Sequence, residues 1–203
     1  MKETALEHAI ETHLHTQYKV YTDGSSFEGG VGAAAILYKN NQIMKICQYH
    51  LGSSTEHTVY EAELIGIILA LFLLMNLYCQ MCNTIVIGLN NQASIRALAN
   101  QDSKPAQYLL DHIHTTVENL QEKQDKIQNT SKFREAHRNK HTLVVCNRGV
   151  INLNIQWVPG HMDFALNDKA DQHTKEAAKG LLSPSSELPK SLRKPLPASV
   201  STL

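Results

Sequence analysis

The first fifty residues change from a helical pattern of apolar positions to extended, β-prone runs. Apolar side chains recur at helical spacing between Glu3 and His15, which predicts a short amphipathic helix. Three strands are expected next, at Tyr18–Asp23, Val31–Lys39 and Gln42–Leu51. The connections between these strands are short, and short connections favour antiparallel pairing.

The rest of the pattern alternates helices with short strands. Helices are expected at Val59–Tyr78, Ala93–Ala99, Ala106–Ile127 and Asp168–Lys179, and strands at Thr84–Leu89 and Asn152–Val158. The first of these helices is apolar nearly all round from Leu64 onward, so it should lie buried against a sheet. The pattern therefore predicts an α/β fold: a five-stranded mixed sheet, three antiparallel strands followed by parallel ones, with helices on both faces.

Two segments depart from this plan. Residues 121–149 are polar, and six Lys or Arg face three Asp or Glu between Glu122 and His141. We expect a helix extension followed by a loop or a small hairpin near Thr142–Cys146, either as a solvated face or as a basic handle for a phosphate backbone. Residues 181–203 are rich in Ser, Pro and Lys and lack periodicity, which predicts a flexible tail. The expected organisation is a helical lead-in (1–16), one domain (17–180) and this tail.

Composition adds few constraints. The chain has 203 residues, of which 42% are hydrophobic and 19% charged, as in ordinary soluble domains. Its formal net charge is zero, so any affinity for nucleic acid must come from local patches. The longest apolar run, Leu64–Leu77, is too short to span a bilayer, and we expect no membrane partner. The cysteines require no oxidising compartment, so we expect an intracellular protein, with nucleus and cytoplasm both open.

Four polar residues lie at the ends of predicted elements. Asp23 ends the first strand, Glu63 lies one turn into the long helix, Asn90 follows the fourth strand, and Asp171 lies one turn into the last helix. An isolated Asp-Gly-Ser sequence most often caps a turn. Hard oxygen ligands brought together from several elements are instead what a pair of Mg²⁺ ions needs for phosphodiester hydrolysis. Glu61 and Glu63 point to different faces of their helix, so only one of them can face the sheet.

Five short motifs, in order and at compatible spacing, resemble type 1 ribonuclease H. They are Tyr21-Thr22-Asp23-Gly24-Ser25, Glu61-Ala62-Glu63-Leu64, Asn90-Asn91-Gln92-Ala93, Trp157-Val158-Pro159-Gly160-His161 and Asn167-Asp168-Lys169-Ala170-Asp171. The resemblance covers roughly residues 17–180 and is closest to the ribonuclease H domains of fungal (basidiomycete-like) non-LTR retroelements. The tail from Leu188-Pro189 also looks like sequence that follows those domains, and origin in a reverse-transcriptase polyprotein is compatible with it.

The resemblance implies a two-Mg²⁺ endonuclease, with Mn²⁺ able to substitute, that cleaves the RNA strand of an RNA–DNA hybrid. It carries metal binding and catalysis to the positions of Asp23, Glu63, Asn90 and Asp171. His161 falls where the family has a mobile histidine that assists proton transfer or product release. Contacts to the nucleic acid are implied for Gly24, Ser25, Thr58 and Gln92.

One position departs from the family pattern. Asn90 stands where relatives have an aspartate, which removes one negative charge from the expected metal site. Either a natural change in a decaying or repurposed copy or an engineered substrate trap would explain it. Leu166, after Ala165, is a second departure close to His161. Two hypotheses follow: a metal-dependent hybrid endonuclease, whole or attenuated by Asn90, or a catalytically inactive domain that keeps the fold and binds nucleic acid.

Overall fold

The structure, a computed structural model, describes residues 2–77, 83–99, 106–128, 151–160 and 164–199. Its centre is a five-stranded sheet with the order β3-β2-β1-β4-β5. The strands are β1 (Tyr18–Phe27), β2 (Gly30–Lys39), β3 (Gln42–Ser53), β4 (Asn83–Leu89) and β5 (Ile151–Trp157). β1, β2 and β3 pair antiparallel, whereas β1–β4 and β4–β5 pair parallel, which confirms the predicted fold class.

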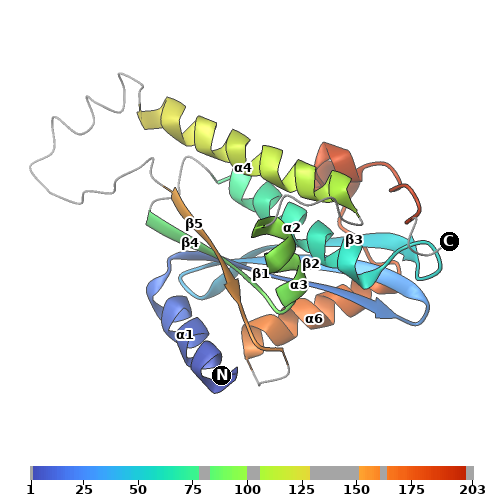
Figure 1. Cartoon of the computed structure of the whole chain (residues 1–203), viewed down its shortest axis with the longest axis horizontal. Helices are drawn as coiled ribbons and strands as arrows, with labels where there is room; N and C mark the ends of the chain where they lie inside the picture. The colour runs from blue at the N-terminus through green and yellow to red at the C-terminus, as the bar shows by residue number, and fades with distance from the viewer. Residues whose placement is uncertain (1, 78–82, 100–105, 129–150, 161–163, 200–203) are drawn as a thin grey trace, which may run out of the picture.

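Helices cover both faces of the sheet (Figure 1). They are α1 (Lys2–His15), α2 (Val59–Met75), α3 (Gln92–Ala99), α4 (Gln107–Gln128) and α6 (Ala165–Ala178). The larger hydrophobic core lies on the side of α2, whose residues from Ala62 to Leu74 are buried almost without interruption. A smaller core lies on the other face, where Tyr21 of β1 and Tyr38 of β2 pack with Ala9 of α1 and Ala170 of α6.

The first strand is longer than the sequence predicts. β1 continues past Asp23 to Phe27, so Asp23 lies inside the strand and the segment Gly24–Ser26 is not a turn. The reversal into β2 occurs at Glu28 and Gly29, which have φ values of 51° and 83°. Two successive positive φ values are typical of the two-residue hairpin turns that match strand twist.

The C-terminal segment is also placed differently from the prediction. Rather than extending as a flexible tail, it forms two short 3₁₀ turns, η1 (Ser185–Glu187) and η2 (Lys190–Leu192), that pack beside β3 and α4 (Figure 1). Leu188 and Leu192 join the larger core. The predicted hairpin at Thr142–Cys146 and most of the basic segment lie outside the described residues. Among the helices described, none combines the length and apolar character needed to cross a bilayer.

Candidate active site

The four predicted site residues come from four elements and meet around Asp23. The amide nitrogen of Asn90 donates a hydrogen bond of 2.8 Å to Oδ1 of Asp23. The negative charge of Asp171 acts on Asp23, and the charge of Asp23 acts on Glu63. Asp23 and Glu63 are both buried, each with 3% of its surface exposed, whereas Asn90 and Asp171 are half-buried.

Asn90 is placed by the parallel pairing of β4 with β5. Asn90 directly follows Leu89, the last residue of β4. The backbone N–H of Val158 donates a hydrogen bond of 2.9 Å to the Leu89 carbonyl. The indole nitrogen of Trp157 donates to the backbone carbonyl of Asn90, also at 2.9 Å. Trp157 at the end of β5 and Val158 directly after it therefore fix the backbone that carries Asn90.

Glu63 is placed by close contact between β1 and the first turn of α2. A Cβ atom on Gly24 would lie 2.3 Å from the backbone nitrogen of Glu63, so only glycine allows this approach. The Gly24 backbone also donates a hydrogen bond to the Glu63 carboxylate. The glycine after Asp23 thus serves helix packing and carboxylate placement together.

Burial makes the two inner carboxyl groups hard to ionise. Burial raises the pKa of Asp23 to about 6, although the hydrogen bond from Asn90 acts in the opposite direction and lowers it. Burial, and next the charge of Asp23, raises the pKa of Glu63 to about 8. Oδ2 of Asp23 and Oε2 of Glu63 are buried without a hydrogen-bond partner in the described structure. A cation beside them would satisfy both oxygens and offset the cost of ionisation.

Asp171 is held on the outer side of the cluster by its own helix. Lys175, one turn further along α6, donates to Oδ2 of Asp171 at 2.6 Å. Thr174 donates to the backbone carbonyl of Asp23 at 3.2 Å, which fastens α6 to β1. The charge of Lys175 also favours ionised Asp23.

The donor set fits a divalent cation only in part. Two unpartnered carboxylate oxygens, on Asp23 and Glu63, are the hard ligands that Mg²⁺ prefers. In the described parts of the chain, however, no three His, Cys, Asp or Glu residues form a group that could hold a metal. Asn90 contributes an amide instead of a carboxylate, and this amide already donates a hydrogen bond to Oδ1 of Asp23. The residues therefore suit a cation held by Asp23 and Glu63, with a weaker set of ligands beyond them.

Glu61 has a separate role, in the N-terminal cap of α2. Its Oε2 accepts hydrogen bonds from the backbone N–H of Thr58 at 2.8 Å and from the Thr58 hydroxyl at 3.0 Å. The Thr58 oxygen in turn accepts from the Glu61 backbone, which completes a capping box. The structure thus separates the two acids: Glu61 caps the helix and Glu63 lies with Asp23.

The other residues predicted to contact nucleic acid or assist catalysis do not join this cluster in the described structure. The hydroxyl oxygen of Ser25 is buried without a partner in the described structure, and Thr58 is committed to the α2 cap. Gln92 is exposed and accepts a bond of 3.3 Å from Arg96. His161 lies outside the described residues.

Sequence reasoning missed the parts played by Lys175 and Asn91. The signal for Lys175 was its position four residues after Asp171 on a helix, the spacing of an ion pair. Asn91 hydrogen-bonds both Glu63 and the start of α3. Its signal was an Asn directly before a helix, where N-cap residues occur.

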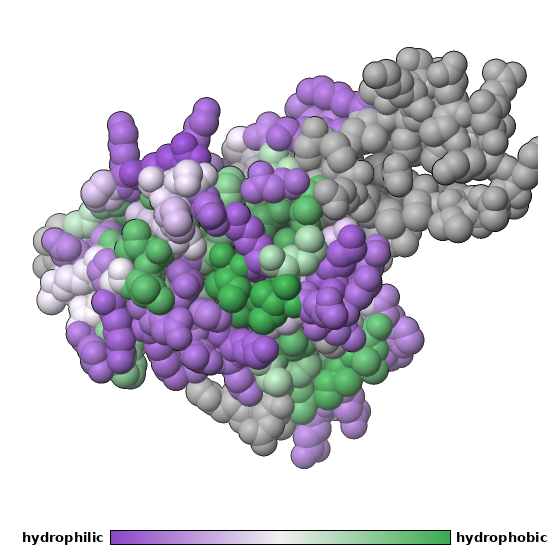
Figure 2. Space-filling model, turned by 180° about the vertical axis from the view of Figure 1, so that it is seen from behind, coloured by the Kyte–Doolittle hydropathy of each residue, from purple (hydrophilic) through white to green (hydrophobic). Residues whose placement is uncertain are grey.

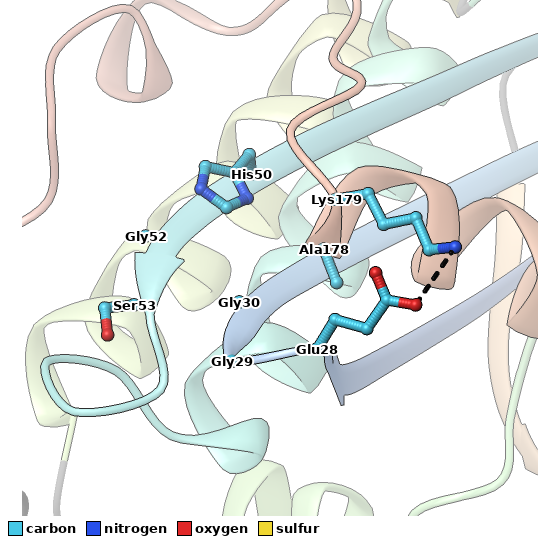
Figure 3. Close-up of a pocket in the computed structure, with 8 residues that line it drawn as sticks. All are labelled: Glu28, Gly29, Gly30, His50, Gly52, Ser53, Ala178 and Lys179. Atoms are coloured by element: carbon cyan, nitrogen blue, oxygen red, sulfur yellow. Dashed lines mark ion pairs between the residues drawn. The ribbon is translucent and has the colours of Figure 1, made fainter.

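A hollow of about 460 Å³ lies away from this cluster (Figure 3). It is formed by the β1–β2 turn, the end of β3 and the end of α6. An ion pair of 3.4 Å between Glu28 and Lys179 crosses its edge, and His50 hydrogen-bonds the Ala177 carbonyl. None of the four clustered residues lines it.

Comparison of the sequence with protein families gives one result that covers most of the chain. The family model described as RNase H matches residues 15–179. A comparison with curated proteins finds no match.

Solved structures with the same fold include two RNase H1 proteins. RNase H1 from the halophilic archaeon Halobacterium salinarum NRC-1 has a TM-score of 0.51 and 16% identity, over 82% of this chain and 100% of that one. LC11-RNase H1, isolated from compost by a metagenomic approach, has a TM-score of 0.53 and 14% identity, over 81% and 96%. A structure of LC11-RNase H1 in complex with an RNA/DNA hybrid has a TM-score of 0.51 and 15% identity, over 80% and 97%. At these identities the similarity establishes the fold.

Proposed function

Because the chain belongs to the RNase H family, we propose that it is an endonuclease that hydrolyses the RNA strand of RNA–DNA hybrids, attenuated by Asn90. One observation carries the proposal. Asp23, Glu63, Asn90 and Asp171 converge from four elements on two buried carboxylate oxygens that have no hydrogen-bond partner among the described residues. A structurally similar RNase H1 has been solved in complex with an RNA/DNA hybrid, which supports the same class of substrate here.

The site residues hold the reacting groups by charge and position. Asp23 and Glu63 would carry the main share of metal binding, and Asp171 would complete it on the outer side. Two Mg²⁺ ions, or Mn²⁺ in their place, would activate a water and stabilise the leaving oxygen. His161 would then assist proton transfer or product release, as the family resemblance implies. Asn90 keeps one carbonyl oxygen for this set but lacks the charge of an aspartate.

Discrimination for a hybrid follows from the shape of the substrate. A-form-like duplexes present 2′-hydroxyl groups in a wide, shallow minor groove, and these groups mark the RNA strand. Gly24, Ser25, Thr58 and Gln92 are proposed to contact the nucleic acid near the site. Phosphate contacts position a duplex without reading its bases, so cleavage should depend little on base sequence.

The test restores the missing carboxylate. Purified chain and its Asn90→Asp variant are incubated with labelled hybrid and Mg²⁺ or Mn²⁺. Loss of even an outer-shell partner of a metal costs ~10–100-fold, so the Asp variant should cut at least about 100-fold faster. Asp23→Asn in the same background is the matched control and should abolish cleavage. Failure of both the chain and Asn90→Asp to cut would overturn the enzyme proposal.

The second candidate is an inactive domain that binds hybrids without cutting them. The observation that favours it is the hydrogen bond from Asn90 to Asp23, which uses a ligand oxygen that an aspartate would leave free. Cleavage by the Asp variant alone, with hybrid binding by both, would assign this role to the chain. Natural decay and an engineered trap both lead to this state.

The basic segment between Glu122 and His141 is proposed to contact the phosphate backbone. Six Lys or Arg against three Asp or Glu would release counterions on binding, so affinity should fall with salt concentration. Reversing its charges should flatten that salt dependence, measured as the slope of log affinity against log salt. An unchanged slope would leave the segment as a solvated face.

We also propose a retroelement context. The resemblance to domains of fungal non-LTR retroelements suggests a reverse-transcriptase polyprotein as the source of the domain over residues 17–180. In such a setting the domain would remove the RNA strand of hybrids made by reverse transcription. Reverse transcriptase activity encoded next to this domain in the source genome would support the context.

A further inference from the structure

The C-terminal segment returns to the connection between β3 and α2 (Figure 1). The backbone N–H of Ser199 donates a hydrogen bond of 2.7 Å to the Glu56 carbonyl. Earlier in the segment, the Tyr49 hydroxyl of β3 donates to the Lys194 carbonyl at 3.4 Å. Ser199 is buried, with 8% of its surface exposed. The end of the segment is therefore held against the domain at two points.

The connection itself is short and leads directly to Thr58, the N-cap of α2. The backbone N–H groups of Glu56 and His57 both donate to the Ser53 carbonyl at 3.0 Å. These two bonds close the turn after β3. The next carbonyl, that of Glu56, bonds the C-terminal segment, so the backbone just before Thr58 is held from outside the turn.

The residue that supplies this bond lies beyond residues 15–179, the part of the chain that the RNase H family model matches. We propose that Ser199 is a positioning residue for hybrid binding at Thr58, an inference that rests on the function proposed above. By holding the Glu56 carbonyl, Ser199 fixes the backbone two residues before the side chain that is proposed to contact the nucleic acid. Ser199 acts through Thr58 rather than by touching the hybrid.

The physical reason is the cost of ordering this connection when the hybrid binds. The capping box ties Thr58 to Glu61 by hydrogen bonds of 2.8, 3.0 and 3.2 Å, so Thr58 has little freedom of its own. Its place then depends on the backbone that leads to it. Fixing a backbone costs conformational entropy, and a surface that is fixed before binding loses less of it on association.

The experiment removes one backbone donor. Ser199→Pro lacks the N–H group and keeps the full length of the chain. A chain that ends at Ala198 loses the same donor without a proline ring, whereas a chain that ends at Val200 keeps it and is the matched control. Melting temperatures show whether each protein is folded. Affinity for a labelled hybrid is measured by fluorescence anisotropy with Ca²⁺ in place of Mg²⁺, and amide hydrogen exchange is followed at Thr58.

We expect Ser199→Pro and the chain that ends at Ala198 to bind the hybrid ~2–10-fold more weakly, the contribution of one hydrogen bond. Both should exchange the Thr58 amide faster, and the chain that ends at Val200 should keep the wild-type values. In the Asn90→Asp background, Ser199→Pro should raise KM by the same factor without lowering kcat, which is the signature of lost uniform binding.

A double-mutant cycle with Thr58→Ala separates positioning from a general loss of stability. If Ser199 acts through Thr58, the two changes are coupled, and Ser199→Pro costs no further hybrid affinity once Thr58 is replaced. An equal further loss in the Thr58→Ala background would overturn the inference. A folded Ser199→Pro protein that binds the hybrid as tightly as the wild type would overturn it too.

Failure of the proposed function has a different signature. Neither the chain nor Asn90→Asp would then bind or cut hybrid, while the Thr58 amide would still exchange faster in Ser199→Pro than in the wild type. Unchanged exchange at Thr58 would show that Ser199 does not hold this connection, whatever the chain binds.

Discussion

Asp23 and Glu63 place two carboxyl groups in one buried location, and ionising both there is unfavourable. The pKa of Asp23 is raised to about 6 and that of Glu63 to about 8, in each case first by burial. A folded-state pKa above the unfolded value means that the folded protein binds these protons more tightly. The stability this provides is present at low pH and is lost as pH rises through the two values.

Glu63→Gln should therefore stabilise the metal-free protein at pH 8 and have little effect near pH 4.5. Each unit of raised pKa corresponds to about 1.4 kcal/mol, so the gain in unfolding free energy at pH 8 should be on the order of 2–4 kcal/mol. Urea unfolding in the presence of a chelator, at both pH values, measures it. The same substitution should abolish hybrid cleavage.

Glu56→Gln is the control for this effect, because Glu56 is exposed and lies outside α2, two residues before its N-cap Thr58. It should leave the pH dependence of unfolding as it is in the wild type. If Glu63→Gln destabilises the protein equally at pH 8 and pH 4.5, ionisation of Glu63 does not lower the stability of the folded wild type.

At this scale the sequence predicts residue types better than their hydrogen bonds. The position of Asn90 was predicted, and its loss of charge was apparent from the family pattern. Its added amide donor toward Asp23 was not, because side-chain orientation depends on the backbone that Trp157 holds. Glu61 and Glu63 illustrate the same limit: helical spacing shows that they diverge, but the capping box assigns their roles.

The contact between β1 and α2 is set by one glycine. Gly24 lies within a strand, where glycine usually weakens structure, and its missing side chain leaves room for the backbone of Ala62 and Glu63. The pattern Asp-Gly-Ser favours a turn when read locally. The structure instead continues β1 to Phe27, because close helix packing, rather than chain reversal, requires this glycine.

Gly24→Ala should displace the first turn of α2. The new Cβ would lie 2.3 Å from the Glu63 nitrogen and 2.5 Å from the Ala62 carbonyl carbon, and neither backbone atom can move without moving the helix. We expect a loss of ~1–3 kcal/mol in unfolding free energy, typical of overpacked cores. Hybrid cleavage by the variant in the Asn90→Asp background should fall further than this instability explains, since Glu63 moves with the helix.

Gly160→Ala is the matched control, because among the described residues the nearest neighbour of a Cβ there is Asn90, at an ordinary 3.6 Å. Chemical denaturation and cleavage rates are compared for both variants. If the two alanine variants have equal stabilities and equal cleavage rates, the close approach of β1 to α2 does not require a glycine at position 24.

For the whole molecule, the C-terminal segment extends the larger core. The Ser183 N–H donates to the Gln48 carbonyl and the Gln48 N–H donates to the Ser183 hydroxyl, both at 3.0 Å, so the segment starts beside the edge strand β3. Further on, Ser191 hydrogen-bonds His112 of α4. The face seen in Figure 2 is mostly hydrophilic, with apolar side chains in separate patches.

Composition could not predict this packing. A Ser-, Pro- and Lys-rich segment without periodicity carries the signature of disorder. Periodicity appears only when a regular helix or strand lies against a core, and this segment uses two single 3₁₀ turns. The sheet and its long helices were predictable because their apolar residues repeat. The tail was not, since two leucines in an irregular segment become buried only through the surface they meet.

Leu188→Ala should therefore destabilise the whole domain. Leu188 and Leu192 are 2% and 3% exposed, and removing a buried leucine side chain typically costs ~2–5 kcal/mol. Leu181→Ala is the matched control, because Leu181 lies in the same segment but is 56% exposed, and it should change stability by less than ~0.5 kcal/mol. Chemical denaturation followed by circular dichroism measures both. If the tail is only loosely attached, the two variants will unfold at the same denaturant concentration as the wild type. If it is part of the core, Leu188→Ala alone will shift the midpoint, because the helices and the tail unfold as one cooperative unit.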